Sequence, residues 1–334
     1  MTTPLRLSVL DQSPIPEGST GADALRNTLD LARLADELGY ARYWVAEHHG
    51  TPMLAGAAPE VLIAAIGSVT ERIRIGSGGV MLPHYSPLKV AEECSILGGL
   101  FGDRVDLGVG RAPGSDRETM FALQRDRRQM SPDDFPEQLA ELLAYFEDDF
   151  PRGHALARLA ALPGAPGTAD VWLLGSSPQS AIWAAELGLP YSVADFINPA
   201  GAENAVLYRE RFQPSRRRQE PELVVSVAAI CANTVEEAER LASSSRMAIA
   251  MLRSGRSIAV PPVERALSFL AQAAGPDLTG GRRVVLGPPD VVRAGLEQVA
   301  AEYAADEVMV VTITHDHAAR RRSYELLADA FRLR

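Results

Sequence analysis

Two patterns of apolar and polar positions alternate along most of the chain. Short runs rich in Val, Ile and Leu are typical of buried strands, and longer segments with an apolar residue every three or four positions are typical of amphipathic helices. The first such pair is Leu5–Leu10 and Ala22–Leu38, and Gly39 stands where a glycine commonly ends a helix. We expect eight strands, at Leu5–Leu10, Arg42–Ala46, Ile73–Leu82, Val105–Val109, Val171–Leu174, Tyr191–Ala194, Leu223–Ile230 and Glu307–Ile313.

A helix is predicted after each of these strands. The helices are expected at Ala22–Leu38, Pro59–Val69, Leu88–Leu100, Pro136–Phe146, Pro178–Leu187, Ala202–Phe212, Val235–Leu252, Asp290–Tyr303 and Ala318–Phe331. Two less regular stretches, Ala112–Thr168 and Ser254–Arg283, interrupt the alternation. The pattern predicts an α/β protein, a (β/α)8 TIM barrel with insertions after strands 4 and 7, forming one domain over residues 1–334. A doubly wound open sheet is the competing architecture, although it usually has fewer strands.

Composition and charge limit the classes of binding partner that the protein can have. The chain is 46% hydrophobic and 23% charged, an ordinary globular composition, and its net charge is −10. Such a charge argues against nucleic acid or an anionic membrane as principal partner. The apolar run Leu7–Leu10 is too short for a signal peptide, and no run approaches the ~20 residues of a membrane span. Cys94 and Cys231 are far apart, which suits a reducing compartment, so we expect a cytoplasmic protein.

Two arginine runs, Arg216–Arg218 and Arg320–Arg322, are interpreted as solvated helix surface. Other polar residues stand directly after the predicted strands. In a parallel barrel all strand C-termini face one mouth, where barrel enzymes place their chemistry. The candidates at this mouth are Asp11, Gln12, Glu47, His48, His49, Arg111, Ser176, Ser177, Asp195, His315 and His317.

The histidine pair after the second strand allows three interpretations. His48 can be a catalytic acid or base with a pKa near neutrality. Both rings can be structural histidines satisfied by Glu47 and its neighbours. Both can also join His315 and His317 in a metal site, although no carboxylate or lysine bridge accompanies them. If the strand geometry continues, at most one of the two adjacent rings faces the pocket.

The turn Gly175–Ser180 has the features of a phosphate site. Ser177 stands at a natural helix N-cap and Pro178 at the first helical position, so the next backbone N–H groups point outward unpaired. Such a helix end binds phosphate, and Arg111 from the neighbouring strand can supply a bidentate cation. The alternative is a capped helix beside a surface arginine.

A glycine pair, Gly78-Gly79, lies within or at the end of the third predicted strand, which is otherwise rich in β-branched residues. Glycine in a strand marks a bulge or a close approach by a ligand or by other backbone. A flat ring lying across the barrel mouth would need such a missing side chain. The alternative is a packing contact with a neighbouring helix.

Taken together and in order, the motifs resemble the bacterial luciferase-like flavin monooxygenases. The similarity covers nearly the whole chain, which makes it more specific than any single motif. The segments that carry it are Trp44–His49, Ile75–Pro83 followed by Ser86-Pro87, Val105–Arg111, Val171–Pro190 and Gly287–Asp290.

The resemblance implies a barrel that binds reduced FMN at its strand C-termini. His48 corresponds to the family's catalytic histidine, and the Gly78-Gly79 bond to its non-prolyl cis peptide under the flavin ring, with Ser77 beside it. Ser176 stands where luciferase's catalytic subunit has a glutamate. The 5′-phosphate is expected on Arg111, Gly175, Ser176 and Ser177. Ser254–Arg283 corresponds to the family's mobile lid.

The predicted function is that of a two-component monooxygenase acting with O2 on a small organic substrate. A separate flavin reductase would supply reduced FMN, because no G-x-G-x-x-G turn follows a strand in this chain. We also expect a homodimer, built through the helices at Ala57–Val69 and Leu88–Leu100. No metal and no light emission are predicted. Three alternatives stay open: a deazaflavin-dependent hydride-transfer enzyme of the same fold, a non-catalytic flavin-binding subunit, and a metal-dependent hydrolase.

Overall fold

The computed structural model describes residues 5–111, 117–123, 134–160, 162–164, 169–273 and 279–333. Its strands are β1 Arg6–Asp11, β2 Arg42–Val45, β3 Arg74–Met81, β4 Val105–Gly110, β5 Asp170–Gly175, β6 Tyr191–Ala194, β7 Leu223–Cys231, β8 Val285–Gly287 and β9 Glu307–Val311. All pair in parallel, in the order β6-β5-β4-β3-β2-β1-β9-β7-β8, and β6 also pairs with β7. Eight strands thus close into the predicted barrel, and β8 extends the outer end of β7.

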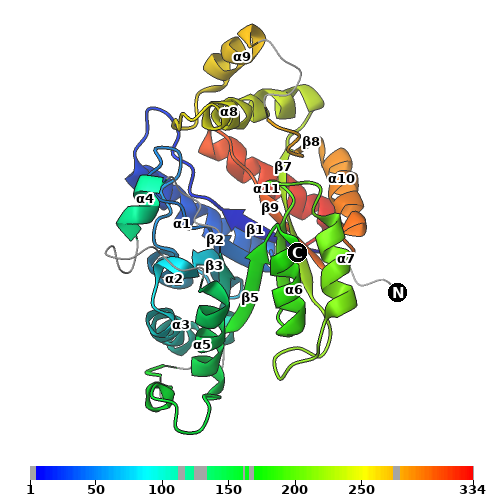
Figure 1. Ribbon diagram of the computed structural model, residues 1–334. Helices are drawn as coiled ribbons and strands as arrows, with labels where there is room; N and C mark the ends of the chain where they lie inside the picture. The colour runs from blue at the N-terminus through cyan, green and yellow to red at the C-terminus, as the bar shows by residue number, and fades with distance from the viewer. Residues whose placement is uncertain are drawn as a thin grey trace.

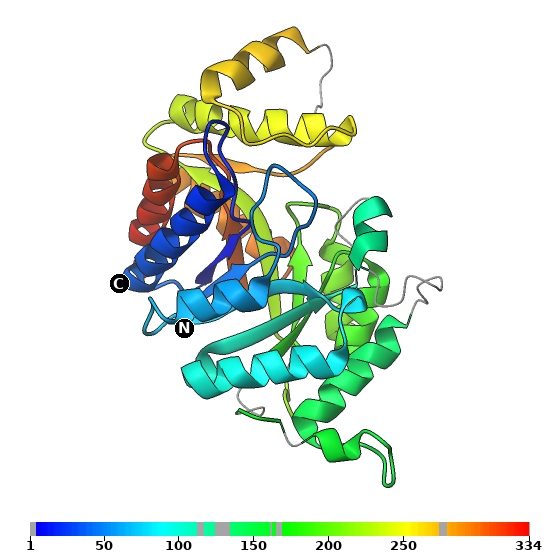
Figure 2. The same cartoon turned by 90° about the vertical axis from the view of Figure 1, so that its left-hand side faces the viewer.

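Helices surround this barrel (Figure 1). They are α1 Gly21–Leu38, α2 Pro59–Gly67, α3 Pro87–Phe101, α4 Arg117–Leu123, α5 Phe135–Glu147, α6 Pro178–Glu186, α7 Ala202–Arg211, α8 Val235–Arg253, α9 Val263–Gln272, α10 Pro289–Glu302 and α11 His317–Phe331. The pair α8 and α9 lies together at the top of the molecule in Figures 1 and 2. Within the described ranges, no helix is both long and apolar enough to cross a membrane.

The expected strands and helices are present with shifts of one or two residues at most ends, and Gly39 ends α1 in the left-handed conformation as predicted. The two insertions hold more regular structure than expected. The first contains α4, and Ser254–Arg283 contains α9. Ala266 and Phe269 of α9 pack against Met247 and Met251 of α8, so a short amphipathic face was enough to build a helix there. Parts of the first insertion, including Ala112–Gly114, lie outside the described residues.

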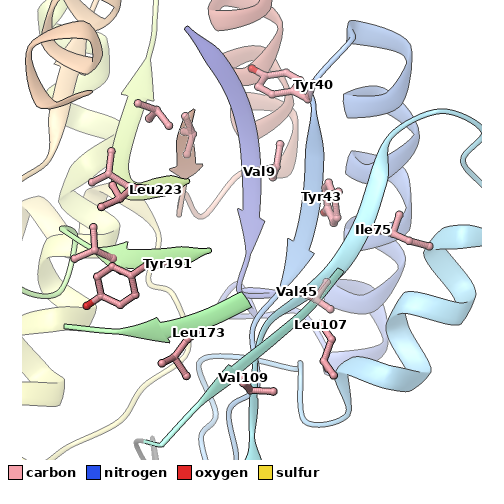
Figure 3. Packing of buried hydrophobic residues seen from close by; sticks show 14 of the residues in the cluster. Val9, Tyr40, Tyr43, Val45, Ile75, Leu107, Val109, Leu173, Tyr191 and Leu223 are labelled. Carbon is pink, nitrogen blue, oxygen red and sulfur yellow. The ribbon is translucent and has the colours of Figure 1, made fainter. Parts of the chain in front are cut away.

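The apolar core forms two layers because successive strand residues face opposite sides. Residues such as Val9, Tyr43 and Leu173 face outward and pack under the helices (Figure 3). Their neighbours face into the barrel and form a smaller cluster. In it the Trp44 and Trp172 rings meet edge to face, with centroids 5.4 Å apart. The barrel interior is therefore packed with side chains rather than open.

Ion pairs close the N-terminal end of the barrel. Arg42, which is 4% exposed, donates to Asp106 at 2.9 Å and to Glu307 at 3.2 Å. Asp106 also accepts from Arg74 and from the Trp44 indole. Each buried charge thus has a partner of opposite sign, as buried charges require. The opposite, C-terminal end of the barrel is left for a site.

The prediction of solvated surface is wrong for Arg320, the first residue of the run Arg320–Arg322. Arg320 is 2% exposed, and its guanidinium donates to Asp11 at 2.7 Å. Asp11 also accepts from the Tyr43 hydroxyl at 2.6 Å. Burial raises the pKa of Asp11, but Arg320 and Tyr43 outweigh it and hold that pKa below its usual value. Asp11, a candidate site residue, is therefore a structural anion beneath α11.

The other run, Arg216–Arg218, lies in the loop between α7 and β7 rather than on a helix. Arg217 pairs with Glu147, and Arg218 pairs with Asp170.

Candidate active site

A cavity opens at the C-terminal end of the barrel, above β1, β2, β7 and β9. It encloses about 1150 Å³, including its opening to solvent. Most of its wall is apolar, and Val311 and Ile313 on its floor also belong to the core inside the barrel or pack against it. The polar residues that line it are Gln12, His48, His49, Thr51, Ser245, Ser257, Arg282 and Arg283.

His48 lies at this cavity with one ring nitrogen unsatisfied. Its backbone N–H donates to the Gly56 carbonyl at 2.7 Å, which fixes the chain just beyond β2. Its Nδ1 is buried and has no hydrogen-bond partner among the described residues. A buried polar atom without a partner is uncommon, and here it belongs to a residue that lines the cavity.

Burial is the main reason that the pKa of His48 falls to about 4, and the nearby His49 lowers it further. The expectation of a pKa near neutrality is therefore wrong. The apolar wall removes the hydration that would stabilise an imidazolium. At physiological pH the His48 ring is neutral.

His49 has a structural anchor that His48 lacks. Its Nε2 lies 2.6 Å from Oε1 of Glu47, which is 2% exposed. Glu47 also accepts from the Tyr85 hydroxyl at 2.7 Å and from the Met81 N–H at 2.8 Å. This network ties the segment after β2 to the end of β3. Both rings nevertheless line the cavity, because β2 ends at Val45 and the strict alternation of a strand ends with it.

The glycine pair of β3 is joined by a cis peptide bond, as the family resemblance implied. A Cβ on Gly78 would lie 2.6 Å from Leu10 Cδ1, and a Cβ on Gly79 would lie 2.7 Å from the Gly108 carbonyl oxygen. The missing side chains are thus required by neighbouring strands, not by a helix. Both glycines remain partly exposed at the mouth.

Ser77 faces the other way. Its hydroxyl is buried and donates to the Gly108 carbonyl at 2.9 Å. It lines a small separate cavity under α2 and α3, together with Glu60 and Tyr85. The structure therefore does not bring this side chain to the barrel mouth.

The turn between β5 and α6 has the predicted cap. The Ser177 hydroxyl accepts from the Ser180 N–H at 3.3 Å, and Pro178 is the first helical residue. The turn is held from behind, since Gly175 O accepts from the Tyr191 hydroxyl and Ser176 O accepts from the Asn204 amide. This leaves the helix end at the surface, where an anion can reach its free N–H groups.

Arg111 follows β4 and lies beside this helix. Its guanidinium carbon is 5.8 Å from the centre of the Trp183 ring on α6. The side chain is exposed and follows the strand that pairs with β5. The cation and the helix N-terminus thus belong to adjacent parts of the mouth.

The predicted site residues lie on or after four consecutive strands of the barrel, so they form one arc around its mouth. His48 follows β2, Gly78-Gly79 lies in β3, Arg111 follows β4 and Ser177 follows β5, and each of these strands pairs with the next. The cavity lies beyond one end of this arc, and of these residues His48 alone lines it. His48 therefore stands where the arc meets the cavity.

The two C-terminal histidines are occupied elsewhere. His315 Nε2 lies 3.1 Å from the Glu17 carbonyl, and His317 Nε2 lies 2.8 Å from Asp30. In the part of the chain that the structure describes, no group of three or more His, Cys, Asp or Glu side chains could hold a metal ion. The proposed cluster with His48 does not form there.

Comparison with known proteins gives a consistent result. Residues 5–307 match the profile of the luciferase-like monooxygenases. The N-acetyl-S-alkylcysteine monooxygenase of Bacillus subtilis (strain 168) is 38% identical over 333 residues, covering 98% of each chain. The crystal structure of apo-MsnO8 superposes with a TM-score of 0.89 at 41% identity, covering 99% of this chain and 98% of that one.

A more distant structure shows the same fold with a bound cofactor. It is the oxygenating constituent of 3,6-diketocamphane monooxygenase from Pseudomonas putida, in complex with FMN. Its TM-score is 0.72 at 18% identity, and the match covers 98% of this chain and 97% of that one.

Proposed function

The chain belongs to the luciferase-like monooxygenase family, and from that membership we propose an FMN-dependent monooxygenase that uses O2 and takes reduced FMN from a separate reductase. The observation that carries this proposal is the position of His48. It lies between an arc of residues suited to a flavin and an apolar cavity suited to an organic substrate. One neutral ring can then contact both.

The residues of the arc fit FMN. Its phosphate would lie at the N-terminus of α6, on Ser176 and Ser177 with Arg111, and its ring would lie along Gly78-Gly79 toward His48. The FMN complex of the distant structural neighbour supports this choice of cofactor. When bound in its reduced form, FMN supplies the two electrons with which one oxygen atom of O2 enters the substrate and the other becomes water.

His48 has a defined part in this arrangement. Being neutral, it presents one ring nitrogen that donates and one that accepts a hydrogen bond. It can therefore hold or move a proton at the boundary between ring and substrate. Because most of the cavity wall is apolar, a substrate that fills the cavity would displace water from that boundary.

The substrate would lie in the cavity. The relative from Bacillus subtilis acts on an N-acetyl-S-alkylcysteine, and an apolar wall also suits an alkyl-bearing substrate here.

The surface of α2 and α3 suits contact with a second copy of the chain. Their exposed apolar residues are Val61, Ile96 and Leu100, which are 64%, 47% and 65% exposed. Apolar surface of this kind is common at homodimer interfaces.

Side-by-side titrations test the cofactor. The wild type and the Arg111→Gln and Ser177→Ala variants are titrated with FMN, riboflavin and a deazaflavin cofactor, and binding is followed by fluorescence. We expect Arg111→Gln to weaken FMN about 10- to 100-fold and to leave riboflavin unchanged, because only FMN carries the phosphate. Arg33→Gln, at an exposed position on α1, controls for net charge. Tight binding of the deazaflavin with none of FMN would favour hydride transfer, and binding of neither would refute the proposal.

A further inference from the structure

Two arginines line the cavity, and among the described residues only Arg283 forms ion pairs with acidic side chains. Arg283 donates to Glu302 at 2.6 Å and lies 3.6 Å from Asp195. Asp195 in turn accepts from the Tyr303 hydroxyl at 2.9 Å. The charge of Arg283 is thus balanced within the protein.

The charge of Arg282 is not balanced by acidic side chains in the described part of the chain. It is partly buried, and no hydrogen bond or ion pair joins it to any residue in the described ranges. Burial lowers the pKa of its guanidinium, and the nearby cation Arg253 lowers that pKa further. The protein as a whole carries a net charge of −10, so this cation without an acidic partner is a local feature. A partly buried cation is costly unless a counter-ion meets it.

Most of the other residues that line the cavity are apolar, although Gln12, His48, His49, Thr51, Ser245, Ser257 and Arg283 also line it. Arg282 comes three residues before β8, whose pairing with Ala229 of β7 holds this stretch against the cavity. Met53, Phe196 and Ile249 form other parts of the wall. A molecule that fits must therefore offer an apolar body and, at one end, a negative charge.

We propose that the cavity binds a substrate with an apolar body and a carboxylate, and that Arg282 binds the carboxylate. The inference rests on the function proposed above, because it makes this cavity the substrate site. A guanidinium presents two parallel N–H donors that match the two carboxylate oxygens. The same contact would hold the apolar body in the cavity that His48 also lines.

Matched neutral and charged probes test this inference. The probes are the straight-chain carboxylates from butyrate to decanoate and the primary amide of each, titrated calorimetrically into wild type, Arg282→Gln and Arg256→Gln. Arg256 is an exposed arginine between α8 and α9 that contacts Met251 and does not line the cavity, so its variant removes the same charge. Circular dichroism and the urea midpoint confirm that each variant is folded.

We expect at least one carboxylate to bind the wild type at least about tenfold more tightly than its amide. Arg282→Gln should weaken that carboxylate about 10- to 100-fold and leave the amide unchanged, whereas Arg256→Gln should change neither. Equal binding of carboxylate and amide, no binding of any carboxylate, or equal behaviour of the two variants would overturn the inference.

FMN titrations of the same variants separate this inference from the function on which it rests. If Arg282→Gln weakens FMN and spares the carboxylate, Arg282 serves the cofactor and the inference fails. If the wild type binds carboxylates through Arg282 but binds no FMN, the cofactor proposal fails and the anion site stands.

Discussion

The depressed pKa of His48 makes a quantitative prediction for stability. In the unfolded chain this histidine titrates near its ordinary pKa of 6.5, whereas in the folded protein its pKa is about 4. Between these values the unfolded state binds a proton that the folded state does not, so the free energy of unfolding falls as the pH falls. Each pKa unit corresponds to about 1.4 kcal/mol, so the loss from pH 7.5 to pH 4 is about 3 kcal/mol.

The assay compares wild type with His48→Gln. Urea unfolding is measured at intervals from pH 7.5 to pH 4, and the difference between the two proteins is plotted against pH. Other groups titrate in both proteins and largely cancel, so the difference should shift by about 3 kcal/mol in favour of the variant as the pH falls. NMR titration of the His48 ring should give a midpoint near pH 4.

A flat difference curve would refute this reasoning, as would an NMR midpoint at or above 6.5. Either result would mean that the ring is hydrated in solution and that the apolar wall does not close over it. The neutral histidine of the proposed function would then have no basis.

Four further substitutions test the packing of charge and backbone. Arg42→Ala should lower the free energy of unfolding by about 3–5 kcal/mol in urea denaturation, because buried carboxylates lose their cation, and a loss below 1 kcal/mol would contradict the ion-pair account. Arg282→Met should instead raise the stability of the ligand-free protein by about 0.5–2 kcal/mol, and a destabilised variant would show that Arg282 already has a partner. Gly79→Ala should destabilise more than Gly78→Ala, because its Cβ meets backbone rather than a movable leucine side chain, with costs of about 1–3 kcal/mol for overpacking. The reverse order in thermal unfolding would contradict the described contacts.

The barrel could be predicted because its strands are nearly continuous apolar runs, which only a parallel sheet covered on both faces requires. The glycine at the end of α1 and the serine cap of α6 could be predicted for a similar reason. Each depends on a local conformation that its own residue type dictates. Local rules were sufficient wherever the cause lay within a few residues.

The burial of Arg320 could have been predicted from the sequence of its helix. It shares one face of α11 with Ser323, Tyr324 and Leu327, which are all buried. That spacing of three, four and seven residues is the signature of a buried helix face. Its acidic partner could not have been found the same way, because Asp11 lies 309 positions away in the chain.

The properties of the cavity depend on contacts of the same long range. The low pKa of His48 requires walls supplied by β7, α8 and the segment before β8, which follow it by nearly two hundred residues or more. The residues near His48 in the sequence do not predict that wall. Arg282 was placed only within a predicted lid, because a single arginine in an irregular stretch has no pattern to distinguish it.

The two ends of the barrel treat charge in opposite ways. At the N-terminal end, Arg42 is surrounded by carboxylates that neutralise it. At the C-terminal end, His48 has an unpaired nitrogen and Arg282 no ion pair among the described residues, although both adjoin apolar walls. A fold selected for stability alone would gain by removing such groups, so their presence requires a benefit that only a ligand can supply. The opposite signs expected for Arg42→Ala and Arg282→Met follow from this difference, which assigns stability to one end and binding to the other.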